Sequence, residues 1–115
     1  MTTRKVQAPM TIDNGEHEGV ITSIEYRTEP YEYVDFVIEF EQGKKLKYGV
    51  PDFLSPTSKL GILLDELGAN LEIDADVDIE STAVGQPVKF MTLNKKNKTG
   101  KEYANVVEGS IRKIS

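Results

Sequence analysis

Hydrophobic and polar residues alternate most clearly along the segment Tyr33–Phe40. Its even-numbered residues are all apolar, whereas its odd-numbered ones include Asp35 and Glu39. Successive side chains of an extended chain point to opposite faces, so this pattern predicts a strand with one buried face. Similar alternation predicts further strands at Glu18–Arg27, Lys45–Val50, Val88–Leu93 and Tyr103–Ile111. The apolar spacing changes phase within the last of these, which indicates a bulge between Tyr103 and Val106.

One helix is predicted at Pro56–Leu67, between the third and fourth strands. Leucines at positions 60, 63, 64 and 67 recur at helical spacing and form a single apolar stripe. Ser55 can cap the free backbone N–H groups of the first turn, and proline fits the first helical position. Residues 69–84 are compatible with either an extended edge or a short helix before Gly85. The order is therefore three strands, a helix and two strands.

The composition is that of a single small domain. The chain has 115 residues, of which 38% are hydrophobic and 29% charged, and it contains no cysteine. The apolar runs are only a few residues long, which excludes a membrane-spanning helix. The first residues lack the apolar stretch of a signal peptide, and no disulfide is possible, so a cytoplasmic protein is expected.

The charge is unevenly distributed along the chain. The net charge is −5, which by itself argues against nucleic acid as a ligand. Residues 65–80, however, hold seven acids and no base, whereas residues 81–115 hold seven Lys or Arg and two acids, a local charge of +5. The average therefore conceals an acidic segment and a basic one.

The sharpest local signal is the basic loop Asn94–Lys101, which contains Lys95, Lys96, Lys98 and Lys101. Further cations, Lys45 and Lys47, are predicted on the outer face of the third strand. Sites for single-stranded nucleic acid combine cations for the phosphates with flat rings for the bases. Arg27, Tyr31 and Tyr33 surround the predicted turn between the first two strands. The alternative interpretation is a solvated hairpin whose lysines protect a strand edge.

Catalytic and metal-binding motifs are not found in the sequence. The single histidine, His17, stands between two glutamates, but neighbours on a strand point to opposite faces and would not converge. The acidic run Asp74–Glu80 invites a calcium interpretation, yet an EF-hand loop would need Gly and Glu where Ile79 and Gly85 stand. We therefore expect no enzyme, no metal and no cofactor. A hydrolase using surface carboxylates is the remote alternative, and the role of residues 72–80 is left open.

Four segments resemble small phage and prokaryotic OB-fold proteins of the single-stranded-DNA-binding type: G-V-I-T-S-I-E-Y, Y-V-D-F-V-I-E-F, S-K-L-G-I-L-L-D-E-L-G and V-G-Q-P-V-K-F. The resemblance implies an all-β fold with one helix, a five-stranded Greek-key barrel whose helix lies between strands three and four. The implied organisation is an N-terminal arm at 1–15, an OB-fold domain at 16–112 and a short tail at 113–115.

The same resemblance implies a function. It is non-enzymatic binding of single-stranded nucleic acid, DNA in particular, with little sequence preference and a role in replication or repair. The implied contact residues are Arg27, Tyr31, Tyr33, Lys45, Lys47, Lys95, Lys96, Lys98, Lys101 and Tyr103. The alternative is an OB-type protein-interaction or assembly subunit, because Met91 and Leu93 form an apolar outer face on the fourth strand. This surface could hold a second copy or another protein, and no membrane contact is expected.

Overall fold

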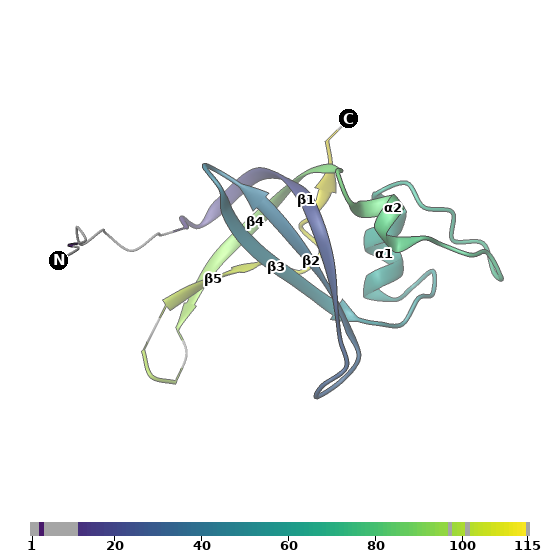
Figure 1. The fold of residues 1–115 in the computed structure, drawn as a ribbon, viewed down its shortest axis with the longest axis horizontal. Helices are drawn as coiled ribbons and strands as arrows, with labels where there is room; N and C mark the ends of the chain where they lie inside the picture. Colours follow the sequence, from purple (N-terminus) through teal and green to yellow (C-terminus); the bar gives the residue numbers. More distant parts are fainter. Residues whose placement is uncertain (1–2, 4–11, 97, 101, 115) are drawn as a thin grey trace.

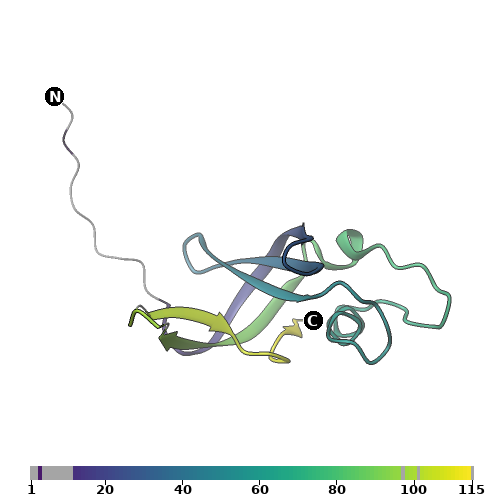
Figure 2. The same ribbon diagram turned by 90° about the horizontal axis from the view of Figure 1, so that it is seen from below.

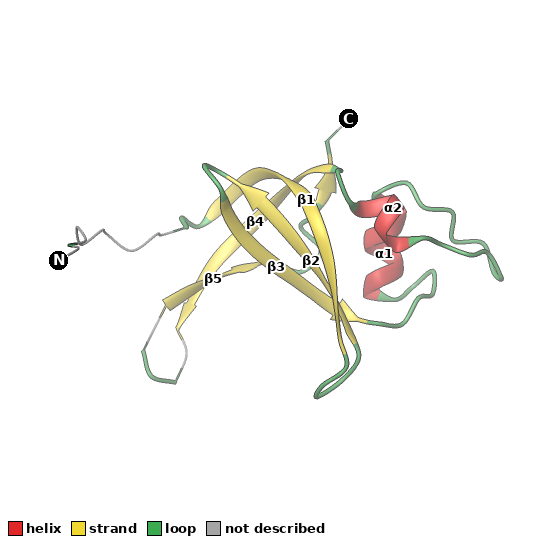
Figure 3. Cartoon of the chain, in the orientation of Figure 1, coloured by secondary structure: helices red, strands yellow, loops and turns green. Residues whose placement is uncertain are grey.

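The protein is built on one antiparallel sheet with two short helices at one end (Figures 1 and 3). The computed structural model describes residues 3, 12–96, 98–100 and 102–114. The sheet contains β1 (Gly15–Arg27), β2 (Tyr33–Phe40), β3 (Lys44–Pro51), β4 (Pro87–Lys96), β5 (Glu102–Val106) and β6 (Arg112–Lys113). The helices are α1 (Lys59–Glu66) and α2 (Ile79–Ala83). No helix in the described part of the chain is long and apolar enough to cross a membrane.

The hydrogen-bonded order of the strands is β3-β2-β1-β4-β5, with β6 paired to β4. The sheet curves so that its two outermost strands, β3 and β5, approach each other (Figure 2). No ladder joins these two strands in the described residues, so the sheet is not closed. The predicted class, mostly antiparallel β-structure with a helix between the third and fourth strands, is confirmed. The sixth strand was not predicted, and a second helix was predicted only as one of two alternatives for residues 69–84.

The core lies on the concave side of the sheet, under α1. The even-numbered residues of β2 are buried as predicted, and so is the leucine stripe of α1. Phe40 and Phe90 meet edge to face with ring centroids 5.1 Å apart, which is a favourable arrangement of two aromatic rings. The core cluster comprises Ile21, Val34, Phe36, Ile38, Phe40, Val50, Leu60, Leu63, Leu64, Leu67, Ala83, Val88, Phe90 and Ile111.

Helix α1 begins at Lys59, three residues later than the sequence pattern predicts. Its N-cap is Ser58, whose hydroxyl accepts a hydrogen bond from the Gly61 backbone N–H at 2.9 Å. The prediction chose Ser55, but Ser55 instead starts a turn in which its carbonyl accepts from the Ser58 N–H. That turn packs against the helix because Gly61 has no side chain. A Cβ at Gly61 would lie 1.7 Å from the Ser55 carbonyl oxygen.

The predicted strand Tyr103–Ile111 is too long: β5 ends at Val106, a turn follows, and β6 begins only at Arg112. The register of β5 on β4 is continuous, so the bulge predicted between Tyr103 and Val106 is wrong. The change of apolar phase instead marks the point where the chain leaves the sheet, after Val106. A register shift does occur, but in β1, between Ile21 and Ser23.

The acidic segment ends in α2, so the short-helix alternative for residues 69–84 is correct. Asp78 caps this helix by accepting a hydrogen bond from the Ser81 N–H at 3.1 Å. Within the described residues, no group of three or more His, Cys, Asp or Glu side chains is arranged to hold a metal ion.

Candidate nucleic-acid interface

A hollow of about 340 Å³ lies where β3 faces the β4–β5 hairpin, along the unclosed seam of the sheet. We call it the β3–β5 groove. Its charged lining residues are Lys47, Lys59, Lys95 and Glu108, and Tyr48 and Asn105 are the other polar ones. The cations come from β3, from α1, which follows it in the chain, and from the more distant β4. The fold therefore brings three lysines to one concave surface.

Strand register explains which side chains of the hairpin reach the groove. Leu93 lies opposite Asn105, and Lys95 lies opposite Tyr103, so these four share one face of β4 and β5. Leu93, Lys95 and Asn105 line the groove. Tyr103 is half exposed beside Lys95 on the same face. A flat ring and a cation thus lie side by side on the hairpin.

Two of the three groove lysines are ion-paired. Lys47 Nζ lies 2.6 Å from Glu25 Oε2, and this carboxylate raises the pKa of the Lys47 ammonium. Lys59 Nζ lies 3.2 Å from Glu108 Oε1, which links α1 to the segment after β5. Lys95 has no ion-pair partner among the residues that the structure describes. With both acids counted, the three lysines leave a charge of +1 at the groove.

Arg27 and Tyr33 form a separate cluster on the outer face of β1 and β2. The Arg27 guanidinium binds both carboxylate oxygens of Asp35, at 2.6 and 3.0 Å, and the hydrogen bonds raise its pKa. It also lies 4.9 Å above the centre of the Tyr33 ring. Asp35 is buried, although the sequence pattern placed it on an exposed face.

Gly49 on β3 provides the space for this cluster. A Cβ at Gly49 would lie 2.5 Å from Asp35 Oδ1 and 3.1 Å from Arg27 Nη2. Neither Arg27 nor Tyr33 lines the β3–β5 groove. Arg27 was predicted to contact phosphate, but its positive charge is already compensated by the Asp35 carboxylate.

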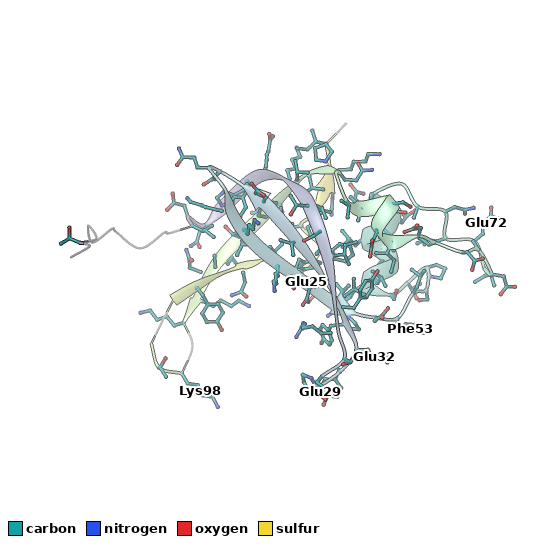
Figure 4. The ribbon with its side chains drawn as sticks, in the orientation of Figure 1. Glu25, Glu29, Glu32, Phe53, Glu72 and Lys98 are labelled. Atoms are coloured by element: carbon teal, nitrogen blue, oxygen red, sulfur yellow. The ribbon has the colours of Figure 1, made fainter. Side chains whose placement is uncertain are left out.

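Other predicted contact residues lie outside the groove lining. Tyr31 is 72% exposed in the β1–β2 turn, which also carries Glu29 and Glu32 (Figure 4). Lys45 is exposed on β3, opposite Glu39 of β2. Each of these two positions therefore has an acidic residue near it, Glu32 beside Tyr31 in the sequence and Glu39 opposite Lys45.

The lysines of the basic loop extend beyond the groove. Lys96 is exposed at the end of β4, and Lys98 projects from the hairpin tip (Figure 4). Lys101 lies outside the described residues. The exposed cations of the hairpin thus continue from the wall of the groove, at Lys95, toward the tip.

The apolar residues predicted to face outward on β4 do so. Met91 and Leu93 are about half exposed, and Leu93 forms part of the groove wall. The Met91 N–H donates to the Ser110 hydroxyl at 3.1 Å, so the backbone of β4 is hydrogen-bonded here to the chain that follows β5.

His17 belongs to a buried polar cluster that sequence reasoning missed. Its Nδ1 faces Glu41 in the β2–β3 turn, and its Nε2 lies 3.0 Å from Thr92 Oγ1 and 2.8 Å from the Asp13 carbonyl oxygen. Carboxylate, imidazole and hydroxyl occur in the order found in hydrolases. Thr92, however, is completely buried and donates its own hydrogen bond to Asp13. No substrate can reach that hydroxyl, so the cluster holds β1, β4 and the turn together.

Asn105 is the second residue that the sequence did not single out. Its Nδ2 is buried and has no hydrogen-bond partner among the described residues. An asparagine within a predicted strand carries no such signal, because only the fold shows which side-chain atoms become buried.

Comparison with protein families finds no matching family model, and comparison with curated proteins finds no match. Function is therefore inferred from the geometry and charges of the groove.

Proposed function

We propose that this chain is a non-enzymatic module that binds single-stranded nucleic acid, DNA in particular, along the β3–β5 groove. The observation that carries the proposal is the meeting of Lys47 and Lys95 in one hollow. These residues were predicted as contacts from separate parts of the sequence. Lysines that line one hollow can neutralise the phosphates of a strand, and the binding should weaken steeply with salt.

The connectivity of the strands supports an OB-type barrel as the scaffold. β1, β2 and β3 pair in succession, β4 returns to pair with β1, and α1 lies between β3 and β4. An OB-fold is a five-stranded, partly open Greek-key barrel, and its ligands lie on the second and third strands between two hairpin loops. The β1–β2 and β4–β5 hairpins project to the same side in this molecule (Figure 1).

The groove has the size and the chemistry for a base with its phosphate. Its volume of about 340 Å³ exceeds that of a nucleobase, and Leu93 provides an apolar wall. Tyr103, half exposed on the same face, offers a ring on which a second base can stack. Each stacked base contributes about 1–3 kcal/mol in single-strand binders.

The test is a titration of a fluorescent oligo-dT at low salt, read by anisotropy. The K47E/K95E double variant should lose binding. The matched control is K89E, whose position on β4 is six residues, or roughly 20 Å, from Lys95. No binding by the wild-type protein at tens of micromolar, or equal losses in both variants, would refute the proposal.

A protein-interaction module is the second candidate, and the half-exposed Met91 and Leu93 are the observation in its favour. It predicts self-association or a stable protein partner. Sedimentation of the wild-type protein and of the M91S/L93S variant distinguishes the two functions. A wild-type dimer that the variant abolishes, together with no affinity for oligo-dT, would favour this candidate.

A further inference from the structure

A second hollow lies at the helix end of the molecule, between the loop from β3 to α1 and the turn that precedes α2. Its volume is about 240 Å³, and six of its nine lining residues are apolar. The other three are Ser55, Glu72 and Asp74, so the lining contains acids and no cation. None of the lining residues belongs to the β3–β5 groove, so the hollow is a separate site.

Large apolar side chains are exposed around this hollow. Ile73 is 79% exposed in its turn, and Phe53, which precedes Leu54 of the wall, is 66% exposed (Figure 4). The turn is held by a hydrogen bond of 3.0 Å from the Ala75 N–H to the Glu72 carbonyl oxygen. Exposed apolar residues that are grouped together and rimmed by charges are typical of a protein-interaction surface. We call the surface formed by Phe53, Leu54, Glu72, Ile73 and Asp74 the acidic face.

The negative charge of the acidic face is not compensated by ion pairs in the described part of the chain. None of the ion pairs found there involves Asp52, Glu72 or Asp74. Burial and, after it, carboxylates that include Glu80 and Asp52 raise the pKa of the Tyr26 hydroxyl, so acids of the β3–α1 loop and of α2 act on one region. An occupant of this face must therefore combine positive charge with apolar side chains.

Residues 4–11 of the chain have this composition. Their sequence, R-K-V-Q-A-P-M-T, contains two cations, no acid and the apolar residues Val6, Ala8, Pro9 and Met10. They precede β1 and lie outside the described residues. The order R-K-V places two positive charges directly before a side chain that is small enough for the hollow.

We propose that the acidic face binds residues 4–11 of a second copy of this chain. Arg4 and Lys5 pair with Glu72 and Asp74, and Val6 enters the hollow. The segment and the face are different surfaces, so the contact is heterologous and forms rings or open chains, not a two-fold dimer. One short segment in one hollow buries little surface, so the contact is weak and acts only at high protein concentration.

The length of β1 favours a second copy over the segment of the same copy. Tyr26, near Asp52 of the β3–α1 loop, is eleven residues, or roughly 36 Å, along β1 from Gly15. Lys5 is only seven residues from Ile12, which allows a reach of at most about 25 Å. The start of β1 and the helices lie toward opposite ends of the molecule (Figure 1). The cations of the same copy therefore do not reach its own acidic face.

Sedimentation velocity of the wild-type protein, over a range of concentrations at about 20 mM and about 300 mM salt, tests the proposal. The weight-average sedimentation coefficient should rise with concentration at low salt and much less at high salt. E72K/D74N and R4E/K5E should each weaken the association about tenfold, as expected for two exposed ion pairs. Asparagine is chosen at position 74 because Asp74 has a φ of 67°, which asparagine tolerates.

An equimolar mixture of these two variants separates a specific contact from a general effect of charge. The segment of R4E/K5E is acidic and fits the altered face of E72K/D74N, whose unchanged segment fits the unchanged face of R4E/K5E. The mixture should therefore associate more strongly than either variant alone. E16K/E18Q is the matched control, because it makes the same change of charge at exposed positions of β1, and it should associate like wild type.

Several results would overturn the proposal. One is a wild-type protein that remains monomeric at several hundred micromolar and low salt, and another is a mixture that associates no more than its separate components. Association that is lost in M91S/L93S and kept in E72K/D74N would place the contact on β4 instead. If a synthetic peptide of residues 3–12 binds R4E/K5E but not a monomeric wild type, the acidic face holds the segment of its own copy, and the second copy is refuted.

Discussion

Replacing Glu25 with glutamine should tighten binding to single-stranded DNA. Glu25 Oε2 lies 2.6 Å from Lys47 Nζ, so a phosphate bound to this lysine would share the ammonium group with the carboxylate. A charge-assisted hydrogen bond from lysine to phosphate is about 2.8 Å long. A phosphate oxygen on the far side of the ammonium is therefore about 5 Å from the carboxylate.

The size of the effect follows from Coulomb's law. Two unit negative charges about 5 Å apart in water repel each other by an amount that corresponds to about fourfold in Kd. Glutamine removes this repulsion and leaves Lys47 with its charge. The gain should be about fourfold near 10 mM salt, where screening is weak, and smaller at 150 mM, where the Debye length is about 8 Å.

Anisotropy titrations of E25Q and wild type with oligo-dT at both salt concentrations provide the measurement. Glu72→Gln is the matched control, because it makes the same change of charge at the opposite end of the molecule from Lys98 (Figure 4). An unchanged Kd in E25Q, or an equal gain in both variants, would show that no phosphate passes Lys47.

Three further outcomes are expected. Gly61→Ala should lower the free energy of unfolding in urea by about 2–3 kcal/mol, because its Cβ would clash with the Ser55 carbonyl; an unchanged midpoint would show that the turn yields freely. The hydrogen bond with His17 lowers the pKa of Glu41 in the folded protein from its usual 4.5. Above pH 4.5 the urea midpoint of wild type should therefore be higher than that of E41Q. This difference should disappear as the pH falls through the lowered pKa of the folded state. A pH-independent difference would contradict the pairing. Lys95→Ala should reduce the slope of log K against log salt by about 0.7, and a slope equal to that of wild type would exclude a phosphate contact there.

The sequence predicted the order of elements well, because each depends on local periodicity. The inner face of β2 and the leucine stripe of α1 are buried as expected. The predicted start of α1 was wrong by three residues, because serine is an equally good N-cap at positions 55 and 58. The choice of Ser58 depends on the turn at Ser55 packing against Gly61. Local pattern cannot reveal a clash with a preceding turn.

The candidate site was less predictable, because pairing across strands is invisible in one sequence. Lys47 was predicted from its place on the third strand and Lys95 from the basic loop, and both line the groove. Arg27 was predicted as a contact, but the register places Asp35 within its reach. The unpaired amide of Asn105 was not predicted at all, because only the packing of the fold buries this nitrogen.

The unclosed seam leaves one edge of β3 and one edge of β5 without a partner strand in the described part of the sheet. A strand of another molecule can pair with such an edge, and lysine side chains beside an edge commonly prevent this pairing. Lys47 and Lys95 stand at this seam, so they oppose intermolecular sheet growth whether or not a ligand is present. Variants that remove these charges should therefore form oligomers or fibrils at high concentration. The charges of Lys47 and Lys95 would then determine the highest concentration at which the protein remains unassociated through its sheet edges.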